Sequence, residues 1–305
     1  MGMASKSIIG GTKMNKKEVN CASEKMLCDL HTHSTFSDGT YTPTELLEEA
    51  EKLGLYAIAL TDHNGVKGLP EFIESSKGRD IVALAGIEFS VDYNEKELHI
   101  IALGVKPEHF DEITEMMEGV RQRKEQSNVE LIRALADAGY EVDYDKIRAE
   151  HGGGYINRAH IATALTEKGY VKSNKEAFAT LLSKTGGFYK EPKRLDAFEV
   201  IEYIKKIGAV AILAHPFLNL EEQELRVFLP IAREHGLDGM ETVYSEYSAE
   251  EIALSQSIAA EYGLIESGGS DFHGSNKTHI SMAKGTGSLE VPARLAKIII
   301  DKIKS

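Results

Sequence analysis

The chain has 305 residues, enough to bury a large core as one α/β domain or as a domain with an insertion. Its 35 basic and 48 acidic side chains give a formal net charge of −13, which argues against an extended groove for a nucleic-acid backbone. Two cysteines cannot form a disulfide framework, and no apolar run reaches membrane-spanning length, so we expect a cytoplasmic protein.

The first functional stretch follows a leader. Residues 1–24 lack the apolar core of a signal peptide, and we exclude them from the fold as a disordered leader or an expression remnant. The apolar run at 26–30 predicts a buried strand. Alternate residues of an extended segment face one side, so His31 and His33 can present two imidazoles to one ion. The Ser-Asp-Gly turn that follows can bring Asp38 back toward the same ion.

Apolar strands then alternate with amphipathic helices up to residue 105. The patterns predict strands at 56–60, 81–87 and 98–103, and helices at 42–54 and 69–76. Polar residues mark the strand ends: His63 follows the first of these strands and Glu88 follows the second. His99 lies near the start of the third.

The next segment, 106–194, has helical periodicity and no convincing buried strand, which predicts a helical insertion subdomain. We expect helices at 110–117, 120–138, 159–168 and 175–183, and a turn through 151–154. The charged run at 121–125 is typical of a solvated helix face.

Apolar strands alternate with amphipathic helices again from residue 195 to residue 305. We predict strands at 209–214, 239–243 and 264–267, and helices at 197–207, 220–234, 248–263 and 293–303. His215 follows the first of these strands, Glu241 lies within the second, and Asp271 and His273 follow the third.

The placement of the polar residues selects the fold class. Strands alternating with helices indicate parallel pairing, and polar residues that follow many different strands meet at one point only in a closed barrel. We therefore predict an α/β fold, a distorted (β/α)7 TIM-like barrel made of 25–105 and 195–305, with 106–194 inserted. The early position of His99 in its strand indicates where the barrel is distorted.

Nine side chains at these positions form a candidate metal-binding set, which uses six of the 11 histidines. The set is His31, His33, Asp38, His63, Glu88, His99, His215, Asp271 and His273. Each residue alone could be an ordinary core residue, but so many ionisable groups in apolar strand contexts are costly without partners. The mixed imidazole and carboxylate donors suit manganese, zinc or iron.

The motifs that carry these residues resemble the polymerase-and-histidinol-phosphatase (PHP) family of metal-dependent phosphoesterases. They run from Asp29 to Gly274 through DLHTHSTFSDG, LTDHN, AGIEFS, LAHP and GGSDFH. The resemblance implies a distorted seven-stranded barrel with up to three metal ions. It assigns one ion to His31, His33, Glu88 and Asp271, a second to Asp38, His63 and His273, and a third to Glu88, His99 and His215, with Glu88 bridging.

The inserted sequence Asn157-Arg158-Ala159-His160 resembles the branch of the family that acts on nucleoside 3′,5′-bisphosphates and short RNA ends. That resemblance implies that Arg158 and His160 contact substrate phosphate. Arginine offers a bidentate fork for a phosphate, and a loop-to-helix junction adds backbone N–H groups. Whether the pair would hold the reacting phosphate or a spectator phosphate stays open, and an ordinary helix start with exposed charges is the alternative.

Clustered ions suit phosphoryl transfer, because they supply a bridging hydroxide as nucleophile and neutralise the phosphate oxygens. We expect two or three divalent ions, with manganese favoured over zinc, iron or magnesium, and a small phosphorylated substrate. Duplex nucleic acid, a membrane or an obligate protein partner is not expected. Two alternatives are a C–N hydrolase built on a metallo-barrel, which normally relies on a bridging lysine, and a non-catalytic PHP interaction module.

Overall fold

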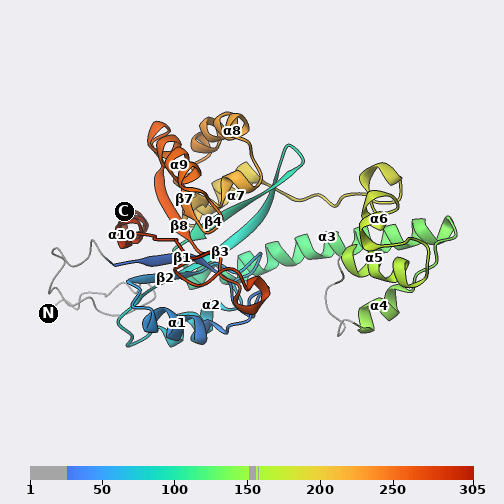
Figure 1. The fold of residues 1–305 in the computed structure, drawn as a ribbon, viewed down its shortest axis with the longest axis horizontal. Helices are drawn as coiled ribbons and strands as arrows, with labels where there is room; N and C mark the ends of the chain where they lie inside the picture. Colours follow the sequence, from blue (N-terminus) through green and yellow to red (C-terminus); the bar gives the residue numbers. More distant parts are fainter. Residues whose placement is uncertain (1–25, 151–155, 157) are drawn as a thin grey trace. The chain divides into compact units, whose positions relative to one another are not determined.

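A computed structural model describes residues 26–150, 156 and 158–305 of the chain (Figure 1). The chain divides into two compact units: unit 1 is Met1–Thr114 with Leu195–Ser305, and unit 2 is Glu115–Arg194. Over the part of the chain that the structure describes, no helix combines the length and the apolar character needed to cross a membrane.

Unit 1 contains a sheet that almost closes on itself. Its main path is β1-β2-β3-β4-β6-β7-β8, and the two-residue strand β5 pairs with β3. The strands are β1 (Cys28–Thr32), β2 (Ala57–Leu60), β3 (Val82–Tyr93), β4 (Lys96–Leu103), β5 (Leu195–Asp196), β6 (Val210–Leu213), β7 (Gly239–Tyr244) and β8 (Ile265–Gly269). The two ends of the path meet where His33 N donates to Phe272 O at 3.0 Å and Asp271 N donates to His31 O at 2.9 Å.

Strand β4 runs against its neighbours, so the expectation of parallel pairing is wrong for this strand. It pairs antiparallel with both β3 and β6. No helix separates β3 from β4; the two-residue turn at Asn94 (φ 50°) and Glu95 (φ 65°) reverses the chain directly. The start of β4 therefore lies at the edge where parallel strands finish, which explains the early position of His99.

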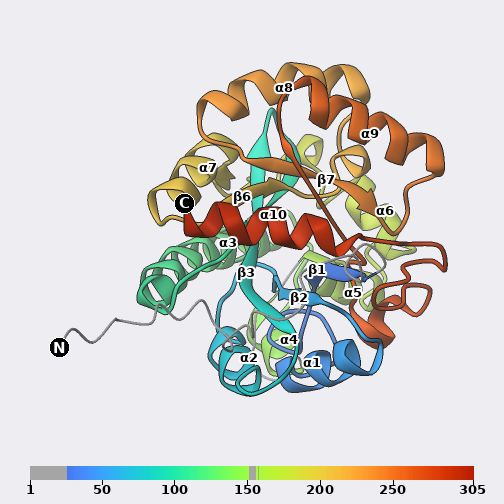
Figure 2. The ribbon, with the colours of Figure 1, turned by 90° about the vertical axis from the view of Figure 1, so that its left-hand side faces the viewer.

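Helices surround the strands of unit 1 (Figure 2). They are α1 (Pro43–Lys52), α2 (Leu69–Ser75), α7 (Ala197–Lys206), α8 (Glu222–Glu234), α9 (Ala249–Glu261) and α10 (Ala293–Lys304), with short 3₁₀ turns η2 (Pro107–His109), η4 (Pro216–Leu218) and η5 (Gly274–Lys277). Apolar residues of α10 such as Leu295 and Ile299 pack with Cys28 and Val210, the first residues of β1 and β6. Helix α10 thus covers the end of the barrel where the parallel strands begin.

Unit 2 is built from helices. They are α3 (Phe110–Asp137), which begins in unit 1, α4 (Tyr144–Glu150), α5 (Arg158–Glu167) and α6 (Asn174–Ala179), with the turn η3 (Lys184–Gly186). The two helices expected at 110–117 and 120–138 are one continuous helix, because Gly119 stays helical, and α4 was not expected. The expected turn at 151–154 lies outside the described residues.

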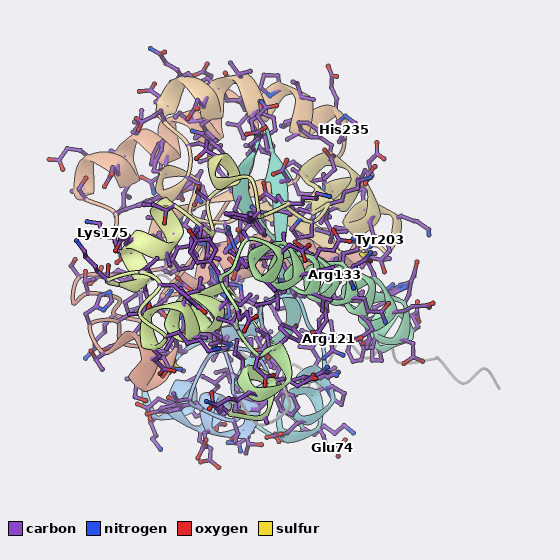
Figure 3. All side chains as sticks on the ribbon, turned by 90° about the vertical axis from the view of Figure 1, so that its right-hand side faces the viewer. Glu74, Arg121, Arg133, Lys175, Tyr203 and His235 are labelled. Atoms are coloured by element: carbon purple, nitrogen blue, oxygen red, sulfur yellow. The ribbon has the colours of Figure 1, made fainter. Side chains whose placement is uncertain are left out.

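The interior of unit 2 is apolar and its surface is charged. Leu131 of α3 and Leu165 of α5 are fully buried in one cluster. Arg121 and Arg133 of α3 are exposed (Figure 3), as expected for a solvated helix face.

Gly269 provides a test of the barrel closure. A Cβ at this position would lie 2.4 Å from the Cβ of His31 and 2.5 Å from its backbone nitrogen. We expect Gly269→Ala to lower the free energy of unfolding by about 1 to 3 kcal/mol, because backbone atoms of β1 cannot move aside. Gly119→Ala is the control for an added methyl group without a clash, since its Cβ meets nothing nearer than Arg123 Nη1 at 3.6 Å, and inside helix α3 it should stabilise by about 0.5 to 1 kcal/mol. Denaturant unfolding of both variants measures the difference, and an unchanged Gly269→Ala would contradict the packing.

Candidate metal centre

The nine predicted ligands all lie in unit 1, and the structure brings them together. They form four overlapping sets in which one donor atom per residue lies within 4.8 Å of the others. The sets are His33, Asp38, His63 and His273; His31, His33 and Asp271; His31, Glu88 and His215; and His63, Glu88 and His99. Two details differ from the expected ligand groups. His33, expected at the first ion, also lies beside Asp38, His63 and His273, the residues expected at the second. His99 and His215, expected together at the third ion, fall in different sets.

The strands explain why these residues meet. His31 lies in β1 and His33 just after it, while His63, His215 and Asp271 follow β2, β6 and β8. The carboxyl ends of parallel strands share one edge of the barrel, so these side chains converge. Glu88 differs from the expectation, because β3 does not end there: its hairpin with β4 extends it to Tyr93, and Glu88 lies in its interior, opposite Ile101.

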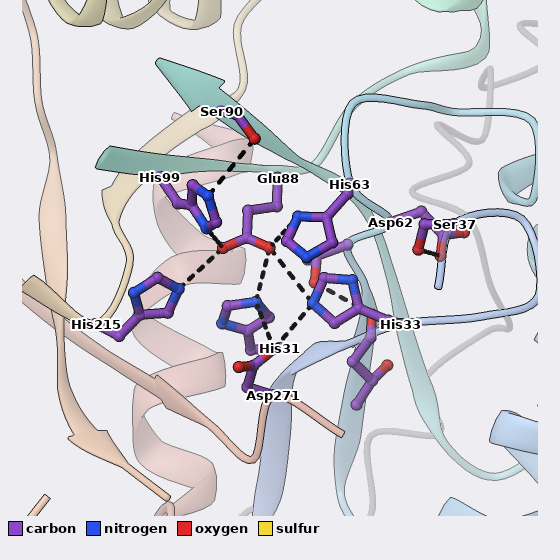
Figure 4. Close-up of polar contacts among 12 residues, drawn as sticks. His31, His33, Ser37, Asp62, His63, Glu88, Ser90, His99, His215 and Asp271 are labelled. Carbon is purple, nitrogen blue, oxygen red and sulfur yellow. Dashed lines mark hydrogen bonds and ion pairs between the residues drawn. The ribbon is translucent and has the colours of Figure 1, made fainter. Parts of the chain in front are cut away.

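Glu88 is the centre of the cluster (Figure 4). Its side chain is fully buried and contacts five histidine rings. Oε2 lies 2.9 Å from His63 Nδ1, 3.2 Å from His31 Nε2 and 3.4 Å from His33 Nε2. Oε1 lies 2.8 Å from His99 Nδ1 and 3.1 Å from His215 Nε2. Each carboxylate oxygen faces its own group of imidazoles, which is the arrangement a bridging carboxylate requires.

Two aspartates flank this centre. Asp271 Oδ1 lies 3.1 Å from His33 Nε2 and 3.6 Å from His31 Nε2. Asp38 lies 3.2 Å from His273 Nε2 and is the most exposed member, with 56% of its side chain accessible. Since Asp271 is almost fully buried, the site opens to solvent on the side of Asp38.

Buried atoms without hydrogen bonds indicate that a cation belongs here. Among the described residues, seven atoms of the cluster are buried and lack a hydrogen-bond partner: His31 Nε2, His33 Nδ1, His33 Nε2, His63 Nδ1, Glu88 Oε2, His215 Nδ1 and His273 Nε2. Such groups are costly to bury unless something satisfies them. Glu88 Oε2 lies 2.9 Å from His63 Nδ1, 3.2 Å from His31 Nε2 and 3.4 Å from His33 Nε2, yet none of these contacts is a hydrogen bond. Within each ligand set one donor atom per residue lies within 4.8 Å of the others, close enough for one ion to contact the whole set.

The hydrogen bonds of two rings support the same conclusion. Nδ1 of His31 donates to Glu241 Oε1 at 3.0 Å, and Nδ1 of His273 donates to the Asp271 carbonyl at 2.7 Å. A neutral ring then carries its lone pair on Nε2. For His31 that atom faces Glu88 Oε2, an arrangement that repels unless a proton or a cation lies between them. A divalent cation satisfies both atoms, so the residues present fit a metal ion.

The pKa values show how strongly these groups interact. Burial opposes ionisation of Glu88, but His31, His99 and His63 hold its pKa well below the ordinary value. Burial lowers the pKa of His33 to about 3, so this ring is neutral and can be a ligand. Burial also disfavours the charged form of His99, but Glu88 raises its pKa to about 10. A cation must displace protons from such a site, and acid should therefore weaken binding.

Three residues at this edge have left-handed backbone conformations. They are Asn64 (φ 52°), His215 (φ 27°) and Asp271 (φ 56°). Positive φ is unfavourable for residues other than glycine and persists only where surrounding contacts enforce it. Asn64 N donates to Glu88 O at 2.8 Å, and Asp271 N to His31 O at 2.9 Å. Backbone carbonyls of two candidate ligands thus fix Asn64 and Asp271, whereas the His215 N–H donates to the side chain of Glu241 at 2.8 Å.

Several supporting residues were not predicted. Buried Asp62 accepts three hydrogen bonds of 2.7 Å, from Ser34 N, Ser34 Oγ and Ser37 Oγ, and so fixes the loop that carries Asp38. Lys277 Nζ lies 2.7 Å from Asp271 Oδ2. For Glu241 the available signal was a charged residue inside an apolar strand, β7, whereas Asp62 follows β2 and Lys277 lies in η5, where charged residues are ordinary.

Arg158 and His160 lie in unit 2, at the first and third positions of α5. The Arg158 guanidinium stacks 4.1 Å from the Tyr189 ring centroid, and its Nη1 donates to Leu182 O at 3.3 Å. These contacts stay within unit 2 and give Arg158 a structural role there. Both residues are partly accessible, and their role toward phosphate remains a prediction.

The sequence of the chain is similar to a known protein family and to several characterised proteins. Residues 29–192, more than half of the chain, match the PHP domain family. A 5′-3′ exoribonuclease of Haemophilus influenzae is 31% identical over 80% of this chain and 89% of its own length. A phosphoribosyl 1,2-cyclic phosphate 1,2-diphosphodiesterase of Eggerthella lenta is 30% identical, covering 82% and 95%. A 3′,5′-nucleoside bisphosphate phosphatase of Chromobacterium violaceum is 29% identical, covering 80% and 86%.

The fold also matches a solved structure. A protein of Bifidobacterium adolescentis assigned as a metal-dependent phosphoesterase superposes with a TM-score of 0.67 and 28% identity, over 91% of this chain and 96% of that one. This match confirms the predicted barrel.

Proposed function

The chain belongs to the PHP family of metal-dependent phosphoesterases, and from this premise we propose that it hydrolyses a phosphate ester of a nucleotide-like substrate, a nucleoside 3′,5′-bisphosphate or a short oligonucleotide. The expectation of a hydrolase acting on phosphate esters with bound metal is confirmed by the family. The observation that carries the proposal is the buried Glu88 carboxylate, with five imidazoles around its two oxygens.

We further propose that the nine clustered side chains hold two or three divalent ions, with manganese favoured because the donors are hard or borderline ligands and leave the ions open to water. When bound, such ions supply a nucleophile at neutral pH and neutralise phosphate oxygens. Glu88 would be a metal ligand through its buried carboxylate, and Asp38, the most exposed of the nine residues, would be the ligand nearest to an entering substrate. The buried rings keep bulk water away from the rest of the cluster.

The substrate class rests on the relatives. The Haemophilus protein is named for exonuclease action on RNA and the Chromobacterium protein for a nucleoside bisphosphate, which supports a nucleotide-like substrate here. The Eggerthella protein, named for a cyclic sugar phosphate, makes a cyclic phosphodiester the second candidate. A cytoplasmic location is part of the proposal, because two cysteines form no disulfide framework and Cys28 is a buried free thiol.

A substrate panel tests the proposal. Manganese-loaded protein is incubated with nucleoside 3′,5′-bisphosphates, 3′-monophosphates, short RNA, a phosphoribosyl 1,2-cyclic phosphate and amides, and each product is quantified. We expect phosphate or nucleotide release from the first three substrates. Hydrolysis of amides alone would favour the C–N hydrolase, and no turnover of any substrate by metal-loaded protein would favour the non-catalytic module.

Arg158→Ala tests whether the insertion takes part in substrate binding. We propose that Arg158, with His160, holds the reacting phosphate, since a guanidinium beside the metal ions would stabilise developing charge. The variant should then lose about 2 to 5 kcal/mol of transition-state stabilisation on a 3′,5′-bisphosphate and a 3′-monophosphate alike. Steady-state kcat/KM for the matched pair measures this.

The alternatives give different results. A loss confined to the bisphosphate would assign Arg158 to a spectator phosphate, and no loss on either substrate would assign it a structural role through contacts such as those with Tyr189 and Leu182. Arg133→Ala, at an exposed position on α3 in the same unit, is the matched control. Thermal unfolding of both variants separates a lost substrate contact from a damaged unit 2.

A further inference from the structure

The buried carboxylate of Glu241 lies beside the cluster but does not belong to the set of nine. Glu241 lies in the interior of β7 and is fully buried. Its neighbour Thr242 points the other way, where its Oγ1 donates to Glu266 Oε2 at 3.0 Å. The alternation of side chains along a strand therefore directs Glu241 into the barrel.

Glu241 connects two candidate ligands that come from different strands. Its Oε1 accepts from His31 Nδ1 at 3.0 Å, and its Oε2 accepts from the backbone N–H of His215 at 2.8 Å. The His31 and His215 rings stack, with centroids 5.6 Å apart and planes 19° from parallel. One carboxylate thus fixes a ring nitrogen of one residue and the strained backbone of the other, whose φ is 27°.

We infer that Glu241 is a positioning residue for the metal centre: it fixes the proton of His31 on Nδ1, leaves Nε2 as the metal-binding atom, and holds His215 in its left-handed conformation. The inference rests on the proposed metal-dependent function. Carboxylates that accept from a ligating histidine orient the ring and increase its basicity, and their loss typically weakens metal binding by about 10- to 100-fold.

Glutamine at this position is a sharp test because an amide has only one acceptor. If the amide oxygen accepts from His215 N, its NH₂ faces His31 Nδ1 and forces the ring proton onto Nε2, the atom that faces Glu88. If the oxygen instead faces His31, the NH₂ meets the His215 N–H, and two donors oppose each other. Either orientation removes one of the two interactions without changing the volume of the side chain.

The experiment measures manganese binding to metal-stripped protein by calorimetry, with elemental analysis for stoichiometry. We expect Glu241→Gln to weaken binding of at least one ion by about 10- to 100-fold, while Thr242→Val, the adjacent residue that faces away, matches the wild type. Turnover of the variant should fall at limiting manganese and recover with excess manganese, because Glu241 contacts ligands and not substrate.

If Glu241→Gln folds and binds manganese as tightly as the wild type, the inference is overturned but the proposed function is not. This holds even if the metal-free variant unfolds at a lower temperature than the metal-free wild type. A wild-type protein that binds no manganese would overturn both. If Glu241→Gln does not fold, Glu241→Asp replaces it: the carboxylate remains but is one methylene shorter and cannot reach both groups. The same weakening is expected, and unchanged affinity would again overturn the inference.

Discussion

His33→Ala is expected to abolish phosphate release while the chain still folds. His33 Nε2 lies 3.1 Å from Asp271 Oδ1 and 3.4 Å from Glu88 Oε2, and His33 belongs to two of the four candidate ligand sets. Removing a ligand from the cluster should cost more than the roughly 100-fold upper value for an outer carboxylate. Asp271→Ala should behave in the same way, since its carboxylate lies beside both His31 and His33.

The fold should survive these changes because the side chains lie at the carboxyl ends of the strands, where a barrel carries its chemistry rather than its packing core. Initial rates, metal content and thermal unfolding are measured on the same preparations. His235→Ala, at the end of helix α8, is the control for loss of a histidine as such. Near wild-type rates with full metal content in His33→Ala would show that the ion at this position is not catalytic.

Chelation is expected to have an effect of similar size. Metal-stripped protein should lose turnover, and manganese should restore it better than zinc or magnesium, because the donors are hard or borderline ligands and leave the ions open to water. The seven unsatisfied buried atoms predict a second consequence: the metal-free protein should unfold more easily. Metal at 100 times its dissociation constant stabilises a folded protein by about 2.7 kcal/mol.

Turnover and thermal unfolding are measured before chelation, after it, and after each metal is returned, with elemental analysis at every stage. A second chelator of different structure controls for direct inhibition. Full turnover in a preparation free of metal by elemental analysis would be incompatible with a metal-dependent reaction.

The residues of the candidate site could be found from the sequence because they form a local pattern. Each follows or interrupts an apolar strand, and an ionisable group in that position is costly unless it has a role. Glu88 was identified in this way although its strand continues to Tyr93. An ionisable residue next to an apolar run is recognisable in the sequence whether the strand ends there or continues. The barrel was also predictable, because alternating strands and helices indicate a parallel sheet and the polar residues that follow many different strands meet only if that sheet closes.

The direction of β4 depended on a short turn. Apolar strands read the same in both directions, so periodicity cannot distinguish parallel from antiparallel pairing. The turn at Asn94 and Glu95 decides it, because parallel strands need a longer connection. The position of His99 in its strand was therefore noticed in the sequence but explained only by the structure.

What the sequence determined by itself is which side chains are available for chemistry, because residue type and strand position are local properties. Only the tertiary structure decided which atoms face one another. His31 and Glu241 are 210 residues apart, and their contact depends on the stagger of β1, β8 and β7 around the barrel. The division of five imidazoles between the two oxygens of Glu88 likewise depends on the register of β3 with its neighbours. Such register is set by packing of the whole barrel, and no single stretch of sequence contains it.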